Sequence, residues 1–172
     1  MTVPTFRTDR LTLRALREGD LQDVVRYAGD YEVSKWLTHV VHPYTMDDAT
    51  AFLMRVKAGE LGMLWVITDQ VGFVGIISIG GELGYWSAPR VWGKGYMTEA
   101  GQAIVAHHFA TSDDPLIKSS HFVANRGSRR VLQKLGFTDV GGKVHFSQAR
   151  NADVDGRRME LARERWESLQ NG

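Results

Sequence analysis

Hydrophobic and polar positions follow two periods along this chain, and these periods predict its order of secondary-structure elements. Alternating or short apolar runs predict strands at 11–15, 63–68, 73–79, 83–87, 116–123, 144–149 and 158–161. Apolar residues at helical spacing predict helices at 20–28, 45–58, 97–110, 125–135 and 162–169. This order predicts an α+β domain around one mixed sheet.

The composition is that of a globular domain, and it removes several classes of function. With 172 residues, 43% hydrophobic and 24% charged, we expect one domain spanning residues 1–172. A formal net charge of +1 calls for no nucleic-acid or membrane partner, and the absence of cysteine excludes disulfides and thiolate sites. No apolar run approaches the ~18 residues of a membrane span, and residues 1–16 lack a signal-peptide pattern, so we expect a cytoplasmic protein.

The most informative segment is residues 85–100, Tyr-Trp-Ser-Ala-Pro-Arg-Val-Trp-Gly-Lys-Gly-Tyr-Met-Thr-Glu-Ala. A predicted strand enters a glycine-rich turn that opens a helix, which directs backbone N–H groups and the helix dipole at one place, as in a pyrophosphate cradle. A Walker A loop is excluded because Gly95 follows Lys94, and the dinucleotide motif because Thr98 replaces its third glycine. The glycines alone are equally compatible with a plain strand-to-helix turn.

The surrounding residues resemble the acyl-CoA signature of the GNAT acetyltransferases, Gln/Arg-x-x-Gly-x-Gly/Ala. Residues 90–95 supply Arg-x-x-Gly literally, but the RimJ/RimL-like form, Tyr-Trp followed by Trp-Gly-x-Gly-Tyr-x-x-Glu-Ala, fits better. In that form Trp92 takes the Gln/Arg position, Gly95 is the central glycine and Met97 replaces the small residue.

A second block carries the same resemblance. Residues 125–137 are similar to the Asn-x-x-Ser and Lys-Leu-Gly-Phe segments of the RimJ/RimL-like branch. Shorter matches stand at residues 8–11, Thr-Asp-Arg-Leu, at 42–44, His-Pro-Tyr, and at 158–161, Arg-Met-Glu-Leu. The resemblance therefore covers nearly the whole chain.

The resemblance implies the GNAT fold, a mixed, mostly antiparallel central sheet of about six to seven strands, flanked by helices and splayed between the fourth and fifth strands. It implies an enzyme that moves an acetyl group from acetyl-CoA to a primary amine, on a protein N-terminus or a small molecule, without a metal. A monomer and a homodimer both fit. The residues assigned to the acetyl-CoA site are Trp86, Ser87, Ala88, Trp92, Gly93, Lys94, Gly95, Tyr96, Met97, Thr98 and Asn125.

Family chemistry also implies catalytic roles. The resemblance implies that a neutral amine attacks the thioester directly. This reaction requires a base for the amine, donors for the oxyanion and an acid for the leaving thiolate. The donors would be backbone N–H groups near Trp86 or Ser87, and the acid would be Ser128. Glu82 is the expected base, with His121 as its rival.

Relatives build the acceptor pocket between their first two helices, so Trp36 and Tyr44 are expected to line it.

Leu132 stands where many GNAT enzymes carry a tyrosine acid, which leaves open an acyl-CoA-binding module without turnover. Asn125 and Ser128 have an alternative interpretation as residues that satisfy the first turn of a helix. The histidine pairs 39/42 and 107/108 lack the spacing of a zinc site, so no metal is expected.

Overall fold

The chain folds around two β-sheets that meet where the start of β5 lies beside β6. The computed structural model describes residues 2–172. The first sheet contains, in spatial order, β1 (Phe6–Arg7), β2 (Thr12–Arg14), β3 (Met63–Thr68), β4 (Phe73–Ile79) and β5 (Leu83–Ser87). Every neighbouring pair is antiparallel, so the predicted meander of residues 63–87 is confirmed.

The second sheet has the order β6-β8-β7 and is also antiparallel. Its strands are β6 (Leu116–Phe122), β7 (Thr138–Ser147) and β8 (Ala152–Ala162). Within the described residues the two sheets are joined by one isolated parallel bridge, between Glu82 and Lys118. Beyond that bridge β5 and β6 diverge, so the expected splay between the fourth and fifth predicted strands is confirmed.

Two hydrophobic clusters lie on opposite faces of the first sheet. In β3, Trp65 and Ile67 belong to one cluster, while Leu64 and Val66 belong to the other. This is the alternation that a strand covered on both faces requires. The first cluster includes residues of α4 (Tyr96–Thr111) and α5 (Arg126–Leu135), and the second includes residues of α1 (Leu21–Ala28) and α3 (Met46–Lys57).

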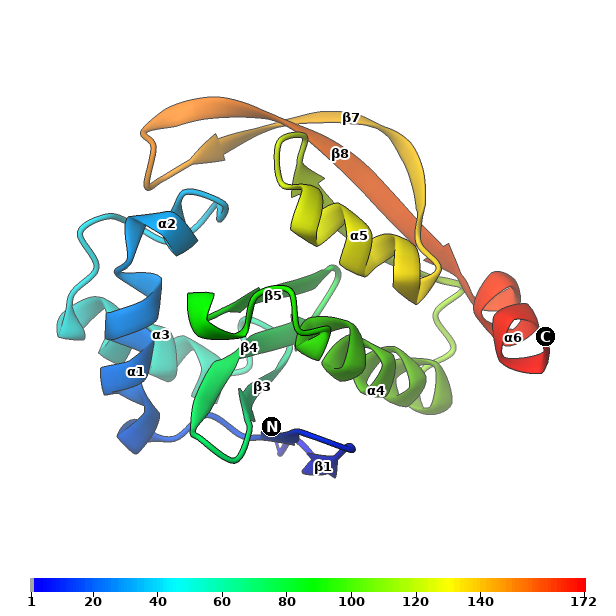
Figure 1. Ribbon diagram of the computed structural model, residues 1–172, viewed down its shortest axis with the longest axis horizontal. Helices are drawn as coiled ribbons and strands as arrows, with labels where there is room; N and C mark the ends of the chain where they lie inside the picture. The colour runs from blue at the N-terminus through cyan, green and yellow to red at the C-terminus, as the bar shows by residue number, and fades with distance from the viewer. Residues whose placement is uncertain (1) are drawn as a thin grey trace.

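Several elements differ from the sequence prediction. The short helix α2 (Tyr31–Ser34), the strand β1 and the 3-10 turns at 18–20 and 89–91 were not expected. The last two strands are longer than predicted, because β7 is mostly exposed and its Gly141-Gly142 pair hides any alternation. The two strands form a long hairpin that arches over α5 towards α2, and α6 (Arg163–Asn171) follows it (Figure 1).

Candidate functional site

A cleft of about 1500 Å³ lies where β5 and β6 diverge, between the two groups of helices. It is continuous from α5 and the start of α4 to α3 and the loop that follows α2. Most of the residues expected at the site line it, namely Trp36, Tyr44, Glu82, Trp86, Ser87, Trp92, Gly93, Gly95, Tyr96, Met97, Thr98, His121, Asn125 and Ser128. The fold therefore brings these fourteen positions to one place.

The turn before α4 has the form of an anion cradle. Gly93 and Gly95 have φ of 77° and 78°, in the left-handed region that L side chains rarely adopt. Gly95 is the N-cap of α4, and within residues 2–172 no side chain caps this helix start. The first amides of a sixteen-residue helix are thus left for another partner at the positive end of its dipole.

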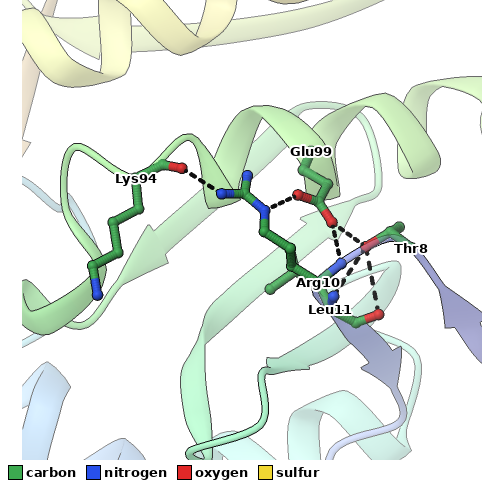
Figure 2. A network of polar contacts seen from close by, with 5 residues as sticks. All are labelled: Thr8, Arg10, Leu11, Lys94 and Glu99. Atoms are coloured by element: carbon green, nitrogen blue, oxygen red, sulfur yellow. Dashed lines mark hydrogen bonds and ion pairs between the residues drawn. The ribbon is translucent and has the colours of Figure 1, made fainter.

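The cradle is braced from behind by the segment that precedes β2 (Figure 2). Arg10 donates through Nε to Glu99 at 2.7 Å and through Nη1 to the Lys94 carbonyl oxygen at 2.9 Å. Glu99 also accepts hydrogen bonds from the Arg10 amide at 2.9 Å and from the Thr8 hydroxyl. The Arg10 guanidinium lies 4.5 Å from the centre of the Tyr96 ring. One arginine therefore fixes both sides of the turn.

The negative charge of Glu99 stabilises these contacts with Arg10 and Thr8. Burial opposes ionisation of Glu99, but the hydrogen bonds from Thr8 and Arg10 outweigh it and hold the pKa of Glu99 below its ordinary value. The carboxylate stands in the first turn of α4, where a negative charge complements the helix dipole. The residues 8–11 and 99 matched family motifs in the sequence, but only the fold shows that they contact each other.

Two expected cofactor contacts do not line the cleft. Ala88 is fully buried and its amide donates to the Val74 carbonyl oxygen at 2.8 Å, while the Lys94 side chain is exposed outside the cleft. Because amide direction alternates along an antiparallel strand, the same pairing turns the Trp86 amide towards β4 and the Ser87 amide towards β6. Of the two expected oxyanion donors, the geometry therefore favours Ser87.

Arg90 has a structural position away from the cradle. Its Nη1 and Nη2 atoms donate to the two carboxylate oxygens of Asp69 at 2.9 and 3.0 Å. This pairing with the Arg90 guanidinium lowers the pKa of Asp69 to about 2. Trp92, in contrast, lines the cleft and donates through Nε1 to the Ser87 carbonyl oxygen at 3.0 Å. The RimJ/RimL-like alignment, with Trp92 at the signature position, is the one that fits the geometry.

Ser128 has a partner that the sequence did not suggest. The Tyr85 hydroxyl lies 2.9 Å from Ser128 Oγ and donates to the Ser128 carbonyl oxygen at 3.1 Å. Burial raises the pKa of Tyr85 well above its ordinary value, so its phenol keeps its proton. Asn125 is the N-cap of α5, and its side-chain oxygen accepts a hydrogen bond from the Ser128 amide at 3.1 Å. Leu132 is fully buried in the core.

The two candidate bases have different surroundings. Glu82 is half-exposed at the bridge between the sheets, and its Oε1 lies 3.8 Å from Lys143 Nζ. His121 is buried, and its Nδ1 lies 2.8 Å from the Phe122 carbonyl oxygen. That contact favours the tautomer with the proton on Nδ1, and Nε2 has no hydrogen-bond partner in the part of the chain that the structure describes.

The wall of the cleft beside Trp36 joins two segments far apart in the chain. Arg150, in the turn between β7 and β8, donates through Nε to the Lys35 carbonyl oxygen at 2.7 Å, and its guanidinium carbon lies 5.2 Å from the centre of the Trp36 ring. The Gln148 amide donates to the Thr38 carbonyl oxygen at 3.0 Å. These contacts fix the loop after α2 against the hairpin, which sequence reasoning missed.

A basic stripe on α5 was also missed. Arg126, Arg130 and Lys134 line the cleft at intervals of four residues, which places them on one face of the helix. The spacing was visible in the sequence, but only the fold shows that this face borders the cleft.

Comparisons with known proteins decide the family. The model of the acetyltransferase (GNAT) domain matches residues 10–138. The N-acetyltransferase YnaD of Bacillus subtilis is 30% identical over 142 residues, which cover 78% of this chain and 82% of YnaD. The chain belongs to the GNAT acetyltransferase family.

Solved structures of GNAT proteins share this fold at low sequence identity. The ribosomal-protein-S5-alanine acetyltransferase of Vibrio fischeri is 18% identical with a TM-score of 0.80, over 95% of this chain and 99% of that one. The spermidine N-acetyltransferase of Vibrio cholerae, in complex with CoA and spermine, is 20% identical with a TM-score of 0.77, over 92% and 99%. The expected GNAT fold is confirmed, and the chain is an acetyl-CoA-dependent N-acetyltransferase.

Proposed function

We propose that this GNAT protein, of the RimJ/RimL-like branch, transfers an acetyl group from acetyl-CoA directly to a primary amine, on a protein N-terminus or a small molecule. The observation that carries the proposal is the start of α4. No side chain within residues 2–172 caps it, and it opens into the same cleft as Ser128 and the edge of β5. A cytoplasmic setting and a single domain over residues 1–172 stay predictions.

The residues of the cleft fit CoA. A Cβ at Gly93 would meet no protein atom within 4 Å, so the space beside this left-handed turn is open to a phosphate. Arg126, Arg130 and Lys134 add positive charge on the facing helix, which suits a ligand with several phosphates. Bound acetyl-CoA supplies the thioester whose acyl carbon the amine attacks.

In the transfer, an N–C bond forms and the C–S bond breaks, so one proton must leave the amine and one must reach the sulfur. Glu82 is the proposed base, acting through water, and the Ser87 amide is the proposed oxyanion donor. Ser128 is the proposed acid. The Tyr85 phenol has one proton, which can go to the Ser128 carbonyl oxygen or to Ser128 Oγ. In the second arrangement the Ser128 hydroxyl proton is free for the leaving sulfur.

The alternative is an acyl-CoA-binding module without turnover, which rests on the buried Leu132 at the tyrosine position. The Tyr85 hydroxyl beside Ser128 supplies a phenol from another element and weakens that alternative. A thiol-release assay with purified protein, acetyl-CoA and a panel of primary amines tests the proposal. We expect amine-dependent release, whereas tight CoA binding without release on every amine would identify the binding module.

A further inference from the structure

The acceptor half of the cleft is an extension of a hydrophobic core. The cluster between the first sheet and helices α1 and α3 is completed by partly buried side chains, four of which also line the cleft, namely Val40, Tyr44, Phe52 and Trp86. Burial, together with the nearby Asp48 carboxylate, raises the pKa of Tyr44 to about 12, so this phenol is neutral at physiological pH. The wall thus offers apolar and aromatic surface.

The carboxylates on this side already have partners within the protein. Asp48 accepts hydrogen bonds from the amide and hydroxyl of Thr45, both at 2.8 Å, in the capping box of α3. Glu60 pairs with Arg55 at 3.1 Å, and both line the cleft. Glu82 is near Lys143, as described above. A polycation would have to compete with Arg55 for Glu60 and with Lys143 for Glu82, while Asp48 keeps its charge and is hydrogen-bonded to the neutral groups of Thr45.

The Trp36 ring, which could attract a cationic ligand, already lies beside two cationic side chains of the protein. Lys35 Nζ lies 5.5 Å and the Arg150 guanidinium carbon 5.2 Å from the centre of the Trp36 ring. Both distances are within the range of a cation–π contact, which engages the ring and adds positive charge beside it. Trp36 is therefore suited to packing rather than to binding an ammonium.

We propose that the acceptor is a primary monoamine with an apolar group of about aromatic size beside its nitrogen, and not a polyamine. This inference rests on the proposed function of the same cleft. The spermidine N-acetyltransferase shares the fold, so the fold does not choose between these acceptors, and the choice belongs to the lining residues. A free aromatic amine and the N-terminal residue of a peptide present the same chemistry.

The test compares phenethylamine with diaminopentane on the full chain. Calorimetry in the presence of CoA measures affinity, and thiol release from acetyl-CoA measures turnover. We expect phenethylamine to bind at least about tenfold more tightly, since apolar contacts of this size change selectivity by that order. The peptides Phe-Gly-Gly and Asp-Gly-Gly form a second pair, and a preference for Phe-Gly-Gly over phenethylamine would identify a peptide N-terminus as the source.

A matched pair of variants tests the role of charge. Val41 lines the cleft and is 38% exposed, so Val41→Glu adds a carboxylate there without disturbing the core. Val71 is 82% exposed in the turn between β3 and β4, outside the cleft, and Val71→Glu adds the same charge elsewhere. We expect only Val41→Glu to lower the preference for phenethylamine over diaminopentane.

The outcomes separate this inference from the proposed function. Equal or tighter binding of diaminopentane, no binding of phenethylamine, or equal effects of the two variants would overturn the assignment. Binding in the expected order without thiol release would leave the assignment standing and contradict the proposed acetyl transfer.

Discussion

The hydroxyl groups of Tyr85 and Ser128 lie 2.9 Å apart, although 43 residues separate them in the chain. Tyr85 comes from β5 and Ser128 from the first turn of α5, so the contact spans the gap between the diverging sheets. The contact ties the Ser128 hydroxyl to the partly buried Tyr85 side chain, in addition to the hydrogen bond that the Ser128 amide makes with Asn125.

Replacing Ser128 tests the acid. Ser128→Ala should lower kcat about 10²-fold and change the KM for acetyl-CoA far less, since the hydroxyl acts on the leaving thiolate. Tyr85→Phe should lower kcat in the wild type but add little to Ser128→Ala, because both remove one interaction. Steady-state kinetics of the two single variants and the double variant provide the cycle.

The control for this cycle is Tyr27→Phe, which removes a phenol hydroxyl from the ring stacked 5.7 Å from Phe73, outside the cleft. It should leave kcat unchanged. Additive losses in the Tyr85 and Ser128 double variant, or a fall in stability alone, would mean that the two hydroxyl groups only support the start of α5.

Gly95→Ala should weaken CoA binding through the backbone. The φ of 78° costs an L residue about 1–2 kcal/mol, and an added Cβ would stand 3.6 Å from Arg10 Nη2, on the side of the brace. Calorimetry with CoA measures the loss.

Gly72→Ala is the matched control, since Gly72 also has positive φ, 147°, with open space around its Cβ and a position outside the cleft. Both variants should lose stability in thermal unfolding, but only Gly95→Ala should lose CoA affinity. Wild-type affinity in the Gly95 variant would remove the phosphate cradle from the proposed site.

The base is tested by pH. A protein α-amine has an ordinary pKa near ~7.7–8.0, so Glu82→Gln should lower kcat/KM at pH 7 by up to about 10²-fold and recover partly towards pH 9, where the amine deprotonates itself. His121→Asn should show little of this recovery. A Glu82 variant that matches the wild type at every pH, together with recovery in the His121 variant, would assign the proton to the buried imidazole.

Acid should release the Asp69–Arg90 pair. Because the folded pKa of Asp69 is lowered to about 2, its contribution to stability is complete above the unfolded value near ~3.9 and is lost as the pH falls towards 2. Asp69→Asn should cost about 1–3 kcal/mol of unfolding free energy at pH 7 and less at pH 3. Urea unfolding at both pH values measures this, and the exposed Asp113→Asn should change neither.

The sequence alone determined the parts of this protein that depend on local pattern. Short apolar runs separated by turn residues in 63–87 specified the meander, and helical spacing specified α4 and α5. The run from Trp92 to Met97 could form its turn only with glycine at 93 and 95, where φ is positive. These features need no distant partner, because backbone preference and hydrophobic period act over a few residues.

The contacts between distant residues depend on the three-dimensional fold. Arg10 reaches Glu99 across 89 positions, Tyr85 reaches Ser128 across 43, and Arg150 reaches Lys35 across 115. The identity of a side chain does not indicate its partner at such separations, since the local sequence around one exposed arginine does not distinguish it from another. The gap between β5 and β6 decides the pairing of Tyr85 with Ser128, because backbone pairing of the two strands is limited to Glu82 and side chains close the cleft beyond it.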